Sequence, residues 1–169
     1  MAQIPTDYDH IVSKTFISLK NKLSELISEG VLQTVERYNG QLDNEKGEDD
    51  VLLPAAYIEI ISVLWESGNW EVRQGEVFFA IHVCVETEKN FDIEDWEVNQ
   101  KIHSKIQGFQ AADIHGAFLS VDDDINHNYN VVIDNILKYR TFVNDESLLK
   151  NRIKDSISTI TVNQTVSET

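Results

Sequence analysis

Several features that often identify a protein's chemistry are scarce or absent in this sequence. Its 169 residues include one cysteine, two prolines and seven glycines. The single Cys84 cannot form a disulfide within the chain, and it lies in an apolar, strand-like run where a thiol is usually a small buried hydrophobe. No apolar run reaches the ~18 residues of a membrane span, and Met1 to His10 does not resemble a signal peptide. We therefore expect the chain to be made in the cytosol and to stay there unless a larger particle carries it.

Basic residues are also scarce. The chain has 14 Lys and Arg against 29 Asp and Glu, so its formal net charge is −15. A surface with this much negative charge repels the phosphate backbone of a nucleic acid and does not bind it by itself. Much of the acid is clustered in residues 43–50, 86–97 and 122–124. The composition therefore argues against free nucleic-acid binding.

The motifs of common active sites are missing as well. There is no Walker A loop, no G-x-G-x-x-G and no G-x-S-x-G, and the histidines lack the paired spacing of a zinc site. Asp122, Asp124 and Asn126 imitate the start of a calcium loop. However, the central glycine is absent, and Ile133 stands where a bidentate Glu is required. We therefore expect no enzyme activity, no cofactor and no bound metal.

The sequence does contain two clear helix patterns. Apolar residues at three- and four-residue spacing predict a helix over residues 7–29, with Thr6 as N-cap and Gly30 ending it in a left-handed conformation. Its apolar face is Tyr8, Ile11, Val12, Phe16, Leu19, Leu23, Leu26 and Ile27. A second helix is expected over residues 93–108, capped by Asp92. Its inward stripe is Ile93, Trp96, Ile102, Ile106 and Phe109.

A period of two predicts the strands. They are expected at residues 31–38, 55–65, 76–85, 114–121 and 131–143, with a turn at Asn39-Gly40 and loops at residues 43–50 and 122–130. The second and third strands should form a hairpin around residues 66–75. The expected fold is α+β, an antiparallel or mixed sheet with two helices packed on it, in the order α-β-β-β-α-β-β. Residues 1–147 should form a single domain, and residues 148–169 a C-terminal arm that is ordered only if it docks.

The predicted strand at residues 76–85 is apolar on both faces. One face carries Val77, Phe79, Ile81, Val83 and Val85, and the other carries Phe78, Ala80, His82 and Cys84. Because a monomeric antiparallel sheet needs only one apolar face, either the two helices cover opposite faces or a neighbouring subunit covers one.

Glu59 is an acidic residue inside the apolar strand predicted at residues 55–65, between Ile58 and Ile60. It is a catalytic acid, an interface ion-pair partner or the solvent face of an edge strand. The candidate subunit interface is Glu59, Phe78, Ala80 and His82.

Five stretches of the chain carry a resemblance to a known family. They are the first helix, Val35-Glu36-Arg37-Tyr38-Asn39-Gly40-Gln41, Leu53-Pro54-Ala55-Ala56-Tyr57-Ile58-Glu59-Ile60, Gln74-Gly75-Glu76-Val77-Phe78-Phe79-Ala80-Ile81-His82-Val83 and Asn135-Ile136-Leu137-Lys138-Tyr139. Together they resemble the small neck proteins of tailed phages, in particular the tail-terminator or tail-completion proteins, the group that includes the lambda tail terminator. The resemblance covers residues 11–145, and it is carried by the order of elements and by a Pro-aromatic-Ile-Glu stretch. The C-terminal arm lies outside it.

The resemblance implies a structural subunit of a six- or twelvefold homo-oligomeric ring in the virion, with no membrane contact. Such a ring caps or joins the tail, contacts neighbouring neck and tail proteins, and leaves a channel for DNA. Acidic loops suit this channel, because like charge keeps the passing phosphate backbone from binding. The candidate lumen residues are Asp49, Asp50, Asp122, Asp123 and Asp124.

Two alternatives stay open at this point. The first is an acidic adaptor or inhibitor that acts by protein–protein contact, and the second is a small enzyme of unknown chemistry. An adaptor should be monomeric or dimeric and an enzyme should have a concave polar pocket, whereas a ring protein should assemble around a hole. Oligomeric state therefore separates the three classes.

Overall fold

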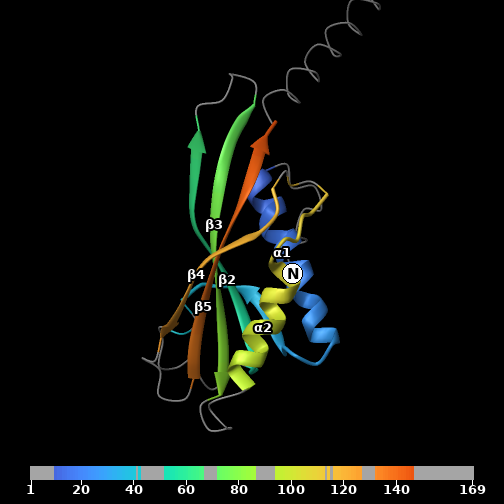
Figure 1. Ribbon diagram of the computed structural model, residues 1–169, viewed down its shortest axis with the longest axis vertical. Helices are drawn as coiled ribbons and strands as arrows, with labels where there is room; N and C mark the ends of the chain where they lie inside the picture. The colour runs from blue at the N-terminus through green and yellow to red at the C-terminus, as the bar shows by residue number, and fades with distance from the viewer. Residues whose placement is uncertain are drawn as a thin grey trace, which may run out of the picture.

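The computed structural model describes residues 10–40, 42, 52–66, 72–86, 94–112, 114, 116–126 and 132–146. Within these residues the chain forms two helices and five strands (Figure 1). They are α1 (Ile11–Ser28), β1 (Thr34–Arg37), β2 (Ala55–Glu66), β3 (Arg73–Glu86), α2 (Glu94–Ile106), β4 (Leu119–Asn126) and β5 (Val132–Asp145). The predicted α+β class and the predicted order of elements are confirmed.

The strands form one mixed sheet in the order β1-β2-β3-β5-β4. The short β1 runs parallel to β2, and the remaining neighbours are antiparallel. The predicted hairpin between the second and third strands is present, and its described ladder runs from Ala55 opposite Cys84 to Glu66 opposite Gln74. β3 and β5 lie at the centre and are the longest strands, with 14 residues each.

The end of α1 is built as the sequence predicts. Gly30 adopts a φ of 72°, and its N–H donates to the carbonyl of Ile27. The N–H of Val31 donates to the carbonyl of Leu26, which completes a Schellman motif. The helix starts at Ile11 behind His10, whose side chain makes no cap hydrogen bond. The predicted cap Thr6 and the first predicted turn lie outside the described residues.

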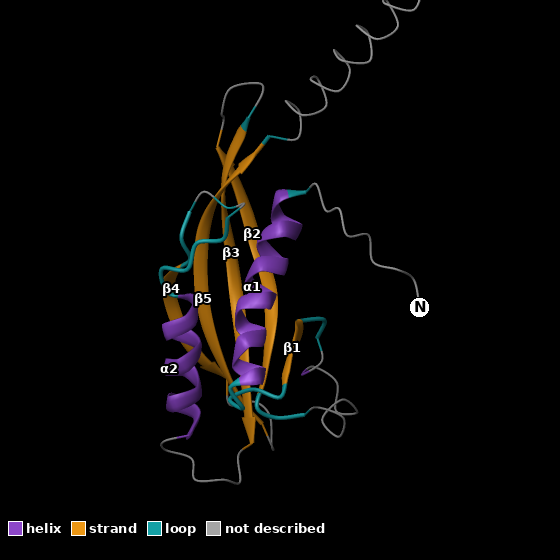
Figure 2. Cartoon of the chain, turned by 90° about the vertical axis from the view of Figure 1, so that its right-hand side faces the viewer, coloured by secondary structure: helices purple, strands orange, loops and turns teal. Residues whose placement is uncertain are grey.

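Both helices cover the same face of the sheet, as Figure 2 shows. Their buried side chains share one core with the facing strand residues. From the helices these include Leu19, Leu23, Leu26, Ile102 and Ile106, and from the sheet Ile58, Phe79, Ile81, Val83 and Tyr139. On the outside, Lys105 of α2 bridges to Glu25 and Glu29 of α1 at 3.3 and 2.6 Å. Of the two alternatives that the sequence left open, helices on opposite faces are therefore excluded (Figure 2), and one face of the sheet has no helix on it among the described residues.

The predicted inward stripe of α2 is only partly correct. Ile102 and Ile106 are fully buried, but Trp96 is 61% exposed. Six residues separate Trp96 from Ile102, which at 3.6 residues per turn places the two on different sides of the helix. Val98, four residues before Ile102, packs against the core instead. Ile27 of α1 is likewise exposed at 40%, although its spacing suggested burial.

The strand predicted at residues 114–121 is placed too early. The strand β4 runs over Leu119–Asn126, and its ladder with β5 continues through Asp122, Asp123 and Asp124. Before it, Phe118 is buried outside any strand and exchanges backbone hydrogen bonds with the end of α2. Apolar residues that fill the core from an irregular segment imitate a strand pattern. Acidic residues suit an edge strand because their side chains stay in water.

The C-terminal arm, with the domain boundary at 147/148, lies outside the described residues. So do Asp49 and Asp50 of the predicted acidic loop. The part of the chain that the structure describes contains no helix that is long and apolar enough to cross a membrane.

Candidate functional site

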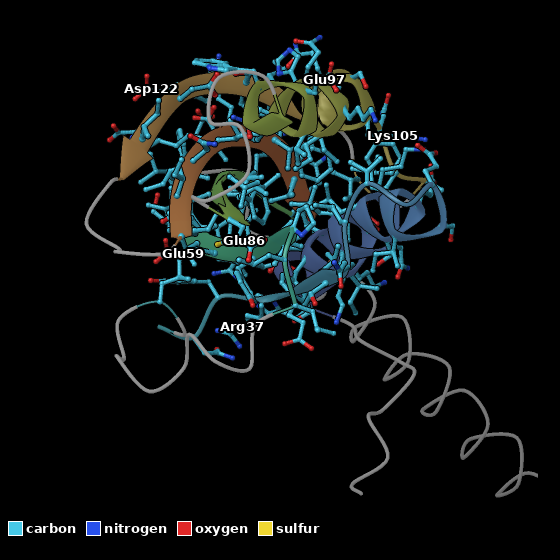
Figure 3. The ribbon with its side chains drawn as sticks, turned by 90° about the horizontal axis from the view of Figure 1, so that it is seen from below. Arg37, Glu59, Glu86, Glu97, Lys105 and Asp122 are labelled. Atoms are coloured by element: carbon cyan, nitrogen blue, oxygen red, sulfur yellow. The ribbon has the colours of Figure 1, made fainter. Side chains whose placement is uncertain are left out.

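The face of the sheet away from the helices is called the open face below. On β3 it carries Phe78, Ala80, His82 and Cys84, since the alternate residues belong to the helix-covered core. Glu59 of β2 lies opposite Ala80 and shares this face. The four candidate interface residues are therefore brought to one face. In Figure 3, Glu59 lies on the side of the molecule away from α1, whereas Lys105 lies beside the helices.

One end of the open face is covered within the chain. A second apolar cluster lies there, formed by Leu42, Ala55, Tyr57, Cys84 and Val132, with Tyr38 and Leu53 packed against it. Nearby, Ala80 and His82 are only 2% and 6% exposed. These two residues are already buried in the single chain, so they are not available to touch a neighbour without rearrangement.

The other end of the open face leaves apolar side chains exposed. Leu64 and Phe142 flank Glu76 in one cross-strand row, and Phe78 shares the next row with Leu119. Leu64 is 58% exposed, Phe142 48% and Leu119 36%, and Phe78 is half-buried. We call Leu64, Phe78, Leu119 and Phe142 the open-face patch.

An ion pair lies within the open-face patch. Arg140 donates to Glu76 at 2.8 Å, and its guanidinium lies 6.0 Å from the ring centre of Phe142. The pair satisfies both charges inside an otherwise apolar surface. Protein–protein interfaces are enriched in aromatic residues and arginine, and both are present in this area.

The patch lies toward the end of the sheet that extends past the helices. Figures 1 and 2 show β2, β3 and β5 continuing beyond the start of α1. Arg73 stiffens this end, because it pairs with Asp145 at 2.7 Å and lies 4.5 Å from the ring centre of Trp65. The sheet therefore projects an ordered, partly apolar end that the helices leave uncovered.

His82 is the centre of a polar cluster on the open face. Its Nδ1 lies 2.9 Å from Asp134 Oδ2, and its Nε2 lies 3.2 Å from Glu59 Oε2. The imidazole also stacks on Tyr38, with ring centres 4.1 Å apart. Burial alone lowers the pKa of His82, but the carboxylates of Asp134 and then Glu59 more than offset this, so its pKa is raised. The site therefore favours the imidazolium, held between two carboxylates.

This cluster fits a structural role better than a catalytic one. Each nitrogen of His82 is already occupied by a carboxylate, and the closest thiol, Cys84, is fully buried. Burial raises the pKa of Cys84, and the charge of Asp134 raises it further, so the thiolate needed for attack is disfavoured. Among the described residues no group of three or more His, Cys, Asp or Glu side chains could hold a metal ion. Of the three interpretations of Glu59, the geometry favours an ion-pair partner, and the pair lies within the chain.

The acidic run on β4 has an arrangement that the sequence did not predict. Asp122 and Asp124 lie on the open face, where Lys138 reaches them at 3.2 and 3.9 Å, whereas Asp123 points to the helix side. Charges on an edge strand prevent unwanted pairing with other strands. The expectation that these three residues form a loop is therefore wrong, and their alternation divides them between two surfaces.

The sequence missed most of the open-face patch. Leu64, Leu119 and Phe142 follow ordinary strand patterns, and nothing local shows that their face lacks a covering helix. Phe78 alone was singled out. No protein-family model matches the chain, and no curated protein matches it in sequence.

Proposed function

We propose that the chain is a structural subunit of a homo-oligomeric ring, in the manner of the phage tail-terminator and neck proteins that its sequence resembles. The observation that carries the proposal is the open-face patch at the projecting end of the sheet. Exposed apolar side chains gathered on one face, such as Leu64 and Phe142, mark an interaction surface. A ring subunit can bury them against its neighbour.

The charge of the chain supports the same function. A formal net charge of −15 keeps the isolated subunit soluble and would keep a passing phosphate backbone from binding in a channel. The proposed channel conducts DNA without holding it. Lysine and arginine of neighbouring neck or tail proteins are natural partners for the outer acidic surface.

In a ring, burial of the open-face patch also determines where the acidic edge strand β4 lies. Asp122 and Asp124 share the open face with the patch, at the opposite side of the sheet from β2. If the patch is buried between neighbours, the β4 edge lies at the border of that interface. We propose that this border faces the lumen, so that Asp122 and Asp124, the two acidic residues of the open face, line the channel.

The test measures the mass of the purified chain by light scattering and by native mass spectrometry. The wild type should form a closed oligomer, six- or twelvefold. The double variant Leu64→Glu/Phe142→Glu should be a folded monomer, because two charges would have to be buried in the interface. Ile27→Glu is the matched control: Ile27 is also an exposed apolar residue but lies on α1. This control should assemble normally.

Two results would overturn the proposal. One is a wild type that stays monomeric at every concentration and within any particle that contains it. The other is equal loss of assembly in the Ile27→Glu control, which would place the contact elsewhere. For the channel, the double variant Asp122→Asn/Asp124→Asn should assemble but slow DNA passage in the particle, and unchanged passage would remove these residues from the lumen.

A further inference from the structure

A second surface lies on the helix side of the sheet and takes no part in the open face. It is a cavity of about 280 Å³ between α2 and the β4–β5 edge. Seven of its lining residues are polar or aromatic: Trp96, Asn99, Gln100 and His103 of α2, and Asp123, Asp124 and Asn135 of the sheet. This volume is slightly below the range of pockets for drug-sized ligands and suits a single side chain.

Two side-chain amides in the cavity wall each have one buried atom without a partner among the described residues. Asn135 is 2% exposed, and neither its Nδ2 nor Oδ1 of Asn99 has a hydrogen-bond partner among the described residues. A buried polar atom without a partner costs about 1–3 kcal/mol. The amides therefore offer a ligand one acceptor and one donor at no further desolvation cost. His103 is by contrast engaged, since its Nδ1 lies 3.1 Å from the hydroxyl of Tyr139.

The charge in the cavity is negative. Asp123 forms no ion pair within the described part of the chain, and no Lys or Arg among those residues lines the cavity. Its field reaches the interior: burial raises the pKa of Tyr139, and the charge of Asp123 raises it further. Asp124 also borders the cavity, but its side chain lies on the open face beside Lys138 and is not counted in the site. A cation is the ligand class that this field favours.

Trp96 gives the cavity an aromatic wall. Trp96 is 61% exposed, so its ring is accessible from solvent. A tryptophan face is the best aromatic partner for a cation, and a planar guanidinium can also stack on it. A lysine ammonium would be attracted by the negative charge of the cavity, but it is not planar and could not stack on the Trp96 ring.

We propose that this cavity binds the guanidinium group of an arginine side chain presented by a basic segment of another protein. The guanidinium would stack on Trp96 and donate to Asp123 and to Asn99 Oδ1. A backbone carbonyl of the same segment would accept from Asn135 Nδ2. Guanidinium supplies five donors in one plane, which matches a site with a carboxylate and an amide oxygen.

The arginines among the described residues of a second copy do not suit the site. Arg73 and Arg140 are already paired with Asp145 and Glu76, and Arg37 has an interaction of its own. A copy also brings 29 acidic residues against 14 basic ones. The charge balance therefore favours a basic partner. The proposal does not depend on ring formation, because the cavity and the open-face patch lie on opposite faces of the sheet.

The test uses the full chain labelled with 5-fluorotryptophan. Of its three tryptophans, the Trp96 signal is assigned with the Trp96→Phe variant. Titration with the peptide Ac-Gly-Arg-Gly-NH2 should shift the Trp96 fluorine signal alone, with a dissociation constant of about 1 mM. The same peptide with citrulline, which keeps the shape of arginine but not its charge, should leave the signal in place.

Two variants test the geometry. Asp123→Asn should weaken binding by about fivefold, since it removes the nearest unpaired carboxylate. Asp122→Asn is the matched control, because it makes the same charge change on the adjacent residue but on the open face. It should change affinity by less than about twofold. Equal binding of the citrulline peptide, equal weakening by the two variants, or no shift of the Trp96 signal would each overturn the proposal.

Discussion

In the His82 cluster, the contributions of Asp134 and Glu59 to the stability of the fold can be measured separately. Asp134 is 1% exposed and lies 2.9 Å from His82, whereas the side chain of Glu59 is 44% exposed and lies 3.2 Å away. A hydrogen bond between charged groups contributes about 1.5–3 kcal/mol when it is buried. An exposed ion pair contributes about 0–1 kcal/mol. Asp134→Asn should therefore destabilise the fold by about 1.5–3 kcal/mol at pH 6, and Glu59→Gln by less than about 1 kcal/mol.

The pH dependence gives the sign of the effect. The pKa of His82 is raised above its ordinary value of 6.5. A raised pKa means that the folded state binds the proton more tightly than the unfolded state does. The stabilisation is fully present below pH 6.5 and is lost as pH rises through the raised pKa. The cost of Asp134→Asn should accordingly shrink between pH 6 and about pH 9.

The measurement is urea unfolding, followed by circular dichroism, of the wild type and both variants at each pH. The difference between wild type and variant at one pH cancels every titration that the two share. Glu59→Gln serves as the control, since it also neutralises one carboxylate beside the same ring. An equal cost of the two variants would refute the assignment of Asp134 as the principal partner. A cost of Asp134→Asn that does not change with pH would show that His82 is not protonated in the fold.

Three further predictions follow from packing and from the chain's end. Gly116→Ala should destabilise by about 1–3 kcal/mol in urea unfolding, because the new methyl would lie 2.6 Å from the backbone nitrogen of Phe142. Unchanged stability would mean that this segment can move away. Cys84 should not react with a thiol reagent until the protein unfolds, because it is 0% exposed and burial raises its pKa; fast labelling of folded protein would contradict this. Deleting residues 156–169 should leave cooperative melting intact but weaken assembly, and loss of the melting transition would refute the predicted boundary.

Local patterns in the sequence determined the type and order of the elements. The three- and four-residue spacing in α1 and the alternation in β3 follow from the geometry of each element, so they can be read without knowing its neighbours. Gly30 predicted the end of α1 for the same reason, since only the local backbone requires its positive φ. At Trp96 the sequence could not tell a buried apolar residue from an exposed one, and at Phe118 it could not tell a strand from an irregular segment that fills the core.

Tertiary structure alone decided which groups meet. His82 is 52 residues from Asp134 and 23 from Glu59, and only the register of β3 with β2 and β5 brings the three together. Likewise, Trp96 and Asp123 line one cavity because α2 packs beside β4. The open face exists because both helices pack on the other side of the sheet. The side on which a helix packs depends on the whole core and not on the sequence of any one segment. An amphipathic element specifies that one of its faces must be buried, but it does not specify what buries it.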